Sequence, residues 1–130
     1  MSEESDGDRG DQRLLDPEVL LASCDGDPEV LVRVLAALRA HLPKELGEAR
    51  DRFVAGDTIG LREKAHRLHG MISTASPVVA MVASELEDEA AINRLDTSAT
   101  LLARLEDMTK RLLRRLDETS IDELLAARTG

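Results

Sequence analysis

Residues 28–54 read PEVLVRVLAALRAHLPKELGEARDRFV and decide the fold class. Apolar side chains recur along this stretch at every third or fourth position, which is the spacing that places them on one face of an α-helix. The positions are Leu31, Leu35, Leu38, Leu42, Leu46, Ala49 and Phe53. Pro43 removes one backbone hydrogen-bond donor near the middle, so we expect a helix that bends there and continues.

Further helix signals lie on both sides of this stretch. An Asp or Ser followed by Pro is typical of a helix start, because the side chain caps free N–H groups and proline fits the first turn. This pair occurs at Asp16-Pro17, Asp27-Pro28 and Ser76-Pro77. Three more helix boundaries are indicated by Asp57 or Thr58, by Asp96 or Thr97, and by Thr119-Ser120. The sequence therefore predicts short helices over about 17–23 and 121–128, and four long helices between them.

The composition agrees with an all-α fold. Leucine and alanine are the commonest residues, at 21 and 16, whereas the chain has one Phe and neither Trp nor Tyr. Leucine and alanine favour helices, and strands are enriched in aromatic and β-branched residues. Because the connections between the long helices are only a few residues long, neighbouring helices must be antiparallel. We expect an antiparallel up-down-up-down four-helix bundle with a short extra N-terminal helix.

The 130 residues suffice for one domain. Residues 1–13 hold five acidic residues, two arginines and almost nothing apolar, so we expect a disordered acidic tail over 1–13 and the helical bundle over 14–130.

The charge balance bears on possible partners. A net charge of −9 argues against binding nucleic acid or an anionic membrane, since both would repel the chain. The single cysteine allows no intrachain disulfide, and the acidic N-terminus lacks the pattern of a signal peptide. Arginine outnumbers lysine 14 to 3, a bias associated with GC-rich bacterial genomes. We expect a monomeric, cytoplasmic, bacterial protein.

The candidate chemistry lies at the histidines. The buried face of the helix after Asp57 is expected to hold Leu61, Ala65, Leu68 and Ile72, so the helical period turns His66 toward solvent. Arg62, His69 and Gly70 lie one turn from His66. Arg62 and His69 could donate hydrogen bonds to an anion held there, and Gly70 leaves room for close approach. The pattern alone also fits an ordinary exposed histidine pair, and His41 is expected to be a solvated flank residue. A metal site from Glu63, His66 and His69 is disfavoured, because their angular spread is wide and a third strong ligand is missing.

The run AHRLHG at residues 65–70, followed by Leu86-Glu87 in the next helix, resembles the signature of histidine-containing phosphotransfer (HPt) domains. Ala65, His66, Leu68, Gly70, Leu86 and Glu87 match that signature, and the resemblance covers about residues 14–117. His69 stands where the family usually has lysine, and Ser76 where it usually has glycine.

The resemblance implies that His66 accepts a phosphoryl group on Nε2 from a phospho-aspartate of a response-regulator receiver domain, or from a histidine kinase or hybrid kinase system, and passes it to another receiver. Such a domain is not an enzyme by itself: the receiver brings Mg²⁺, an acidic pocket and a lysine, and this chain is expected to bind no cofactor or metal. The expected phosphoryl-stabilising or docking residues are Arg62, Arg67, His69, Gly70 and Ser73. The alternative is a helical adaptor that binds signalling partners without being phosphorylated.

Overall fold

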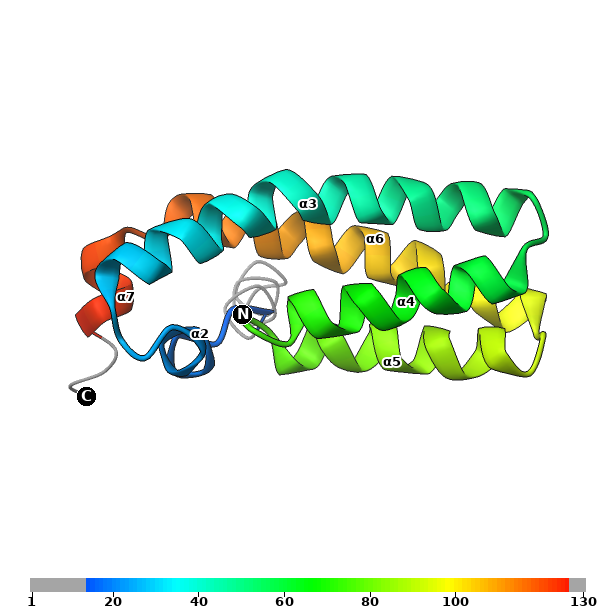
Figure 1. Ribbon diagram of the computed structural model, residues 1–130, viewed down its shortest axis with the longest axis horizontal. Helices are drawn as coiled ribbons and strands as arrows, with labels where there is room; N and C mark the ends of the chain where they lie inside the picture. Colours follow the sequence, from blue (N-terminus) through cyan, green and yellow to red (C-terminus); the bar gives the residue numbers. More distant parts are fainter. Residues whose placement is uncertain (1–13, 127–130) are drawn as a thin grey trace, which may run out of the picture.

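The computed structural model describes residues 14–126, and all regular secondary structure in this part is α-helical, which confirms the all-α prediction (Figure 1). The helices, labelled as in Figure 1, are α2 (Pro17–Ser23), α3 (Pro28–Val54), α4 (Thr58–Ile72), α5 (Pro77–Ala91), α6 (Leu95–Glu118) and α7 (Ile121–Ala126). The expected tail over 1–13 and the end of the expected helix over 121–128 lie outside the described residues. Within 14–126, no helix combines the length and the apolar character needed to cross a membrane.

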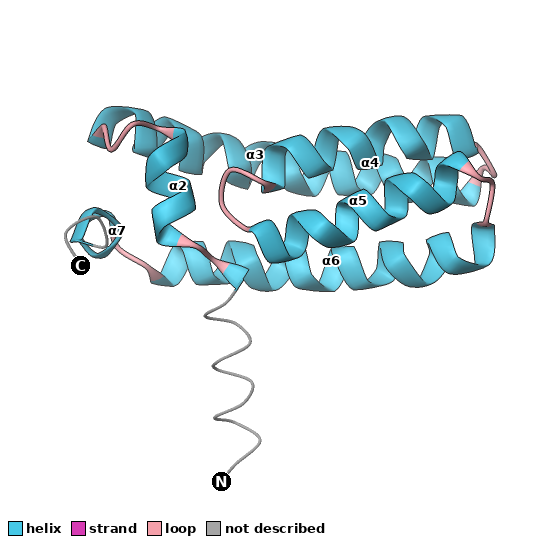
Figure 2. Ribbon diagram, turned by 90° about the horizontal axis from the view of Figure 1, so that it is seen from below, coloured by secondary structure: helices cyan, strands magenta, loops and turns pink. Residues whose placement is uncertain are grey.

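The four long helices lie side by side, and each runs opposite to the one before it (Figures 1 and 2). Helix α4 packs against α3 and α5, and α6 packs against α5 and α3. Helices α2 and α7 lie together at one end, where α7 contacts both α2 and α3 (Figure 1). Helix α4 therefore has neighbours on two flanks, and its remaining side faces outward.

Most helix starts form where the sequence predicts them. Carboxylate or hydroxyl oxygens of the capping residues accept hydrogen bonds from first-turn N–H groups at 2.8–3.2 Å. The capping residues are Asp16, Asp27, Asp57 and Ser76. Helix α3 continues through Pro43, as expected, and Gly56 adopts the positive φ of +73° that lets the chain leave α3.

The predicted start of α6 is wrong. Neither Asp96 nor Thr97 caps this helix, which begins at Leu95. Its N-cap residue is Arg94, whose side chain makes no capping hydrogen bond. Asn93 adopts a φ of +60°, so the chain turns into α6 earlier than the capping pattern suggests. Asp96 instead lies in the first turn, where its negative charge interacts favourably with the helix dipole.

The core is built mostly from leucine and alanine side chains of α3 to α6, and Leu20 and Leu21 of α2 and Leu124 of α7 extend it at one end. All the predicted α3 positions except Phe53 are buried, and Phe53 is half-buried. In α6 the spacing of the apolar residues predicts a buried stripe of Leu101, Leu105, Met108, Leu112 and Leu116. In the structure Leu101 and Met108 lie at the flank of the buried stripe, and Ser98 and Thr109 are fully buried with hydroxyls that have no hydrogen-bond partner. The spacing of leucines alone therefore misplaced the centre of the α6 face by part of a turn.

A polar network joins α3 to α4. The side chain of Glu45 is only 9% exposed, and its Oε1 accepts a hydrogen bond from Lys64 Nζ at 3.1 Å. Lys64 also donates to Glu48, and Arg67 Nη1 lies 3.6 Å from Glu45 Oε1. The hydrogen bond to Glu48 raises the pKa of Lys64, and the same bond lowers the pKa of Glu48. A charge as buried as that of Glu45 needs these partners, so the network holds one rotation of α4 against α3.

Replacing Glu48 by Gln is expected to remove a stabilising contribution that exists at neutral pH and disappears in acid. The pKa of Glu48 lies below its ordinary value of 4.5 in the folded chain, because the hydrogen bond from Lys64 favours the carboxylate. The contribution is therefore complete above pH 4.5 and is lost as the pH falls through the folded pKa. Urea unfolding of both proteins should show a gap in unfolding free energy at neutral pH that shrinks as the pH falls below 4.5. Glu63→Gln, at an exposed carboxylate of α4, is the matched control, and a Glu48 gap that does not change with pH would contradict this account.

Candidate functional site

His66 lies in the middle of α4, on the side that faces away from the bundle. Ala65, directly before it, and Leu68, two residues after it, are completely buried. Because these two side chains point into the bundle, the helical period directs His66 toward solvent. The side chain of His66 is 74% exposed. The structure therefore confirms the predicted outward orientation of His66.

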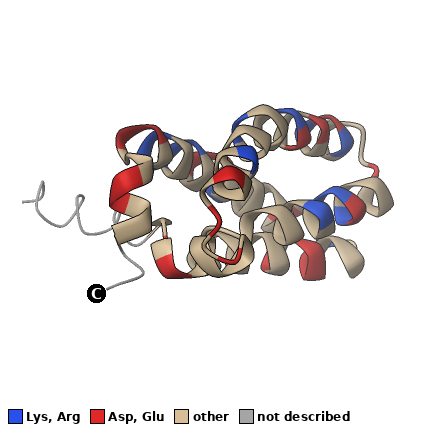
Figure 3. Cartoon of the chain, turned by 60° about the vertical axis from the view of Figure 1, so that its left-hand side comes forward, with Lys and Arg blue, Asp and Glu red and all other residues tan. Residues whose placement is uncertain are grey.

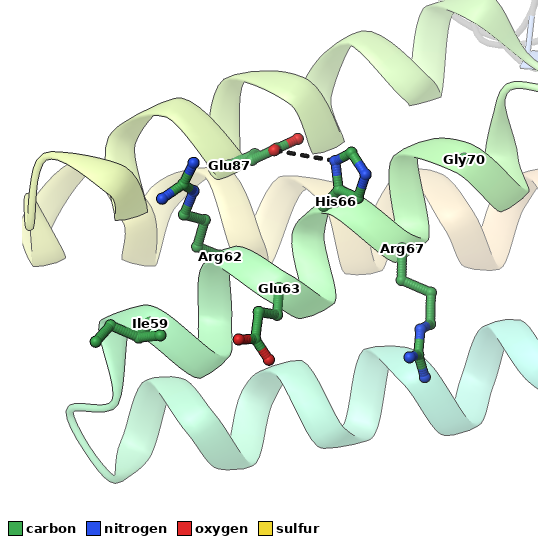
Figure 4. Close-up of a pocket in the computed structure, with 7 residues that line it drawn as sticks. All are labelled: Ile59, Arg62, Glu63, His66, Arg67, Gly70 and Glu87. Carbon is green, nitrogen blue, oxygen red and sulfur yellow. Dashed lines mark hydrogen bonds and ion pairs between the residues drawn. The ribbon is translucent and has the colours of Figure 1, made fainter.

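Glu87 of α5 contacts the imidazole of His66. Nδ1 of His66 lies 3.1 Å from Oε2 of Glu87, whose side chain is only 23% exposed (Figure 4). An ionised carboxylate can only accept a hydrogen bond, so this contact favours the proton on Nδ1. In the neutral ring, Nε2 is then left with a free lone pair.

An open groove of about 780 Å³ surrounds this pair of residues. It is lined by Ile59, Arg62, Glu63, His66, Arg67, Gly70 and Glu87 (Figure 4). The two arginines of the groove point in different directions. Arg62 extends toward α5 and Glu87, on the same side as the imidazole, whereas Arg67 extends toward α3, where it meets Glu45 (Figure 4). Arg62 is thus the cation placed beside His66.

Gly70 lies one turn beyond His66, and the space outside it is empty. A Cβ atom built on Gly70 would meet no other atom within 4 Å, and the same is true of Gly47 in α3. The packing of the chain itself therefore does not require a glycine at position 70. What its missing side chain provides is open space on the outer surface of α4, next to the imidazole.

Two of the expected site residues lie outside the groove. His69 is half-buried and does not line it. Ser73 ends α4, and its hydroxyl donates to the carbonyl oxygen of Gly70 at 2.9 Å, so this side chain serves the helix end. His41 is exposed, as expected, and lines a separate groove between α3 and α4.

The geometry also bears on the disfavoured metal site. Glu63 points toward α3 and the imidazole of His66 toward α5, so the two side chains diverge (Figure 4). Across residues 14–126, no group of three or more His, Cys, Asp and Glu side chains is arranged to hold a metal ion.

Sequence reasoning left three residues of the groove without a site role. Glu87 was visible as part of the Leu86-Glu87 pair, but its position against His66 depends on the register of α5 along α4. Ile59 carried no signal beyond its helical position, and Glu63 was considered only as a ligand of the disfavoured metal site. Figure 3 shows acidic and basic residues mixed along α3, α4 and α6, whereas α5 carries four acidic residues and no basic one, so no block of basic residues marked the site either.

The arrangement presents an accessible nitrogen nucleophile, a carboxylate that orients it, and a nearby guanidinium that can bind an anion. The family model of the Hpt domain matches residues 33–115, a stretch that contains both His66 and Glu87. No curated protein and no solved structure matches the chain significantly. Because the family model covers more than half of the sequence, the chain belongs to the Hpt domain family, whose members are phosphotransfer modules of phosphorelay signalling.

Proposed function

We propose that His66 is the phosphoacceptor of this chain, and that it takes a phosphoryl group at Nε2 from the phospho-aspartate of a receiver domain and passes it to another receiver. The observation that carries the proposal is the contact of Nδ1 with Glu87, which leaves Nε2 of a 74% exposed imidazole free above an open groove. The scaffold is, in this proposal, an antiparallel up-down-up-down four-helix bundle, and the protein acts as a monomer in a bacterial cytoplasm.

In the transfer step, the lone pair of Nε2 attacks phosphorus and an N–P bond forms. The bond between phosphorus and the aspartyl oxygen breaks, and the aspartate leaves with that electron pair as a carboxylate. The imidazole ring gains a positive charge while Nδ1 keeps its proton. Glu87, 3.1 Å from Nδ1, faces this charge and stabilises it as it develops. Transfer to the next receiver is the reverse of these bond changes.

Arg62 is the residue best placed to bind the phosphoryl oxygens. It lines the groove on the same side as the imidazole, and a guanidinium forms strong charge-assisted hydrogen bonds with phosphate oxygens (Figure 4). His69, which stands where the family usually has lysine, does not line the groove. In this chain we therefore assign the donor role to Arg62.

The receiver has to cover the face of α4 that carries His66, because the phosphoryl group passes directly between the two proteins. Beside this face, a second groove of about 410 Å³ between α3 and α4 has the apolar side chains of Val34, Leu38 and Met71 in its wall. Arg67 lines both grooves. An apolar patch with a charged rim suits a transient interface, in which the receiver supplies Mg²⁺, an acidic pocket and a lysine.

Replacing His66 by Gln should abolish phosphorylation and leave the fold intact. Exposed substitutions usually change the unfolding free energy by less than about 0.5 kcal/mol, so the helical circular dichroism should persist. The measurement is acid-labile, base-stable phosphate on the chain after incubation with phosphorylated receiver domains. His41→Gln and His69→Gln are the matched controls and should keep the label. Label that persists in His66→Gln would refute the assignment, and receiver binding without any label on the unaltered chain would favour the adaptor.

Replacing Glu87 by Ala is expected to slow phosphoryl transfer about 10- to 100-fold, the size of effect that losing a carboxylate partner has at histidines that bind metals. Glu87→Gln keeps an acceptor without the charge and should fall between this variant and the unaltered chain. Glu85→Ala, at an exposed carboxylate of the same helix, should transfer normally. If Glu87→Ala lowers only the thermal stability and the folded protein transfers at the normal rate, Glu87 has no role in the reaction.

Arg62→Ala should reduce the transfer rate about 10- to 150-fold, because a charge-assisted hydrogen bond contributes about 1.5–3 kcal/mol. His69→Ala should have the smaller effect, since His69 lies outside the groove. Single-turnover transfer from one phosphorylated receiver measures both, with Arg104→Ala on α6 as the control for losing a surface arginine. A larger loss in His69→Ala than in Arg62→Ala would reverse the assignment of the donor.

A further inference from the structure

Ile59 is a large apolar side chain that the bundle does not use. It is 73% exposed, and among the described large hydrophobic residues only Val54, at 75%, is more exposed. Ile59 nevertheless lines the groove that contains His66 (Figure 4). The two residues are seven positions apart on α4, which is two helical turns, or about 10 Å along the helix, and brings them onto the same face.

We propose that Ile59 is the apolar anchor on which the phosphoryl-carrying partner docks, so that the partner's footprint extends from His66 toward the turn between α3 and α4. The inference rests on the proposed function and adds to it the direction in which the partner lies. Ile59 has charged neighbours at Arg62 and Glu63 within the same groove. An exposed apolar residue with a polar surround is the composition of an interface centre.

The size of a protein interface supports this placement. Interfaces of small to standard size bury about 600–800 Å² on each partner, which corresponds to a disc of about 14–16 Å radius. A partner centred over His66 therefore reaches Ile59, about 10 Å away along α4. Gly70 lies on the same face beyond His66 and leaves the surface open there. The outer face of α4 thus offers an apolar contact on one side of the nucleophile and space for close approach on the other.

The groove that Ile59 shares with His66 also indicates which protein binds there. Any protein that covers Ile59 covers the groove of His66, so a second copy bound there stably would block the phosphoryl transfer. The partner that exchanges the phosphoryl group has to cover the same groove in order to react. We therefore assign the contact to this partner, and it is made and broken with each transfer.

The test compares Ile59→Ala with Ile92→Ala. Both substitutions remove the same atoms from exposed isoleucines, but Ile92, which is 57% exposed, does not line the groove. The probe is the receiver domain that phosphorylates the unaltered chain fastest among those encoded in the same genome. We expect Ile59→Ala to raise the KM for transfer about tenfold, equivalent to about 1.4 kcal/mol, and Ile92→Ala to change it less than about twofold. Labelling by phosphoramidate, a small phosphodonor that needs no docking surface, should be equal in all three proteins.

The outcomes separate this inference from the proposed function. Transfer to Ile59→Ala with an unchanged KM, or an equal loss in Ile92→Ala, overturns the anchor and leaves the role of His66 intact. Reduced phosphoramidate labelling of Ile59→Ala also overturns it, because the substitution then acts on the chemistry. A failure of every receiver to phosphorylate the unaltered chain overturns both the proposed function and the anchor. Sedimentation that shows a dimer dissociated by Ile59→Ala would replace the partner with a second copy.

Discussion

The burial of Ala65 and Leu68 in the bundle is the constraint on which the rest of the site depends. Both side chains are completely buried, so α4 cannot rotate without exposing apolar surface. His66, between them in sequence, is consequently held on the outer side. The buried carboxylate of Glu45 adds a polar constraint in the same direction, because its ion partners Lys64 and Arg67 also lie on α4. Apolar packing and charge pairing thus select one rotation of the helix.

In this rotation, the charged residues of α4 face different neighbours on its two flanks. On the flank toward α5, Arg62 lies beside the imidazole of His66 and its carboxylate partner on α5. On the other flank, Lys64 and Arg67 pair with carboxylates of α3. On a single helix, the flank that carries the proposed phosphoacceptor is therefore separate from the flank that pairs with α3. A nucleophile that is oriented but left open to solvent is suited to a reaction in which the rest of the catalytic groups arrive with the partner.

The sequence by itself determined the features that depend on short-range interactions. Helix capping by Asp16, Asp27 and Ser76 involves residues two or three positions apart, so it can be recognised without knowing what packs where. The outward orientation of His66 follows equally from the helical period and its apolar neighbours. The motif around this residue also identified the family, which the match over residues 33–115 confirms.

Only the tertiary structure decided how separate helices meet. The contact of Glu87 with His66 depends on the register of α5 along α4, and the different directions of Arg62 and Arg67 depend on what lies on each flank. Neither is encoded in residue spacing within one helix. Thr109 is buried although it is polar. The face of α6 that packs inward is set by the summed apolar area of the whole stripe, and one polar residue within it is buried with the rest. Local periodicity settles which residues share a face, whereas packing between helices settles what that face meets.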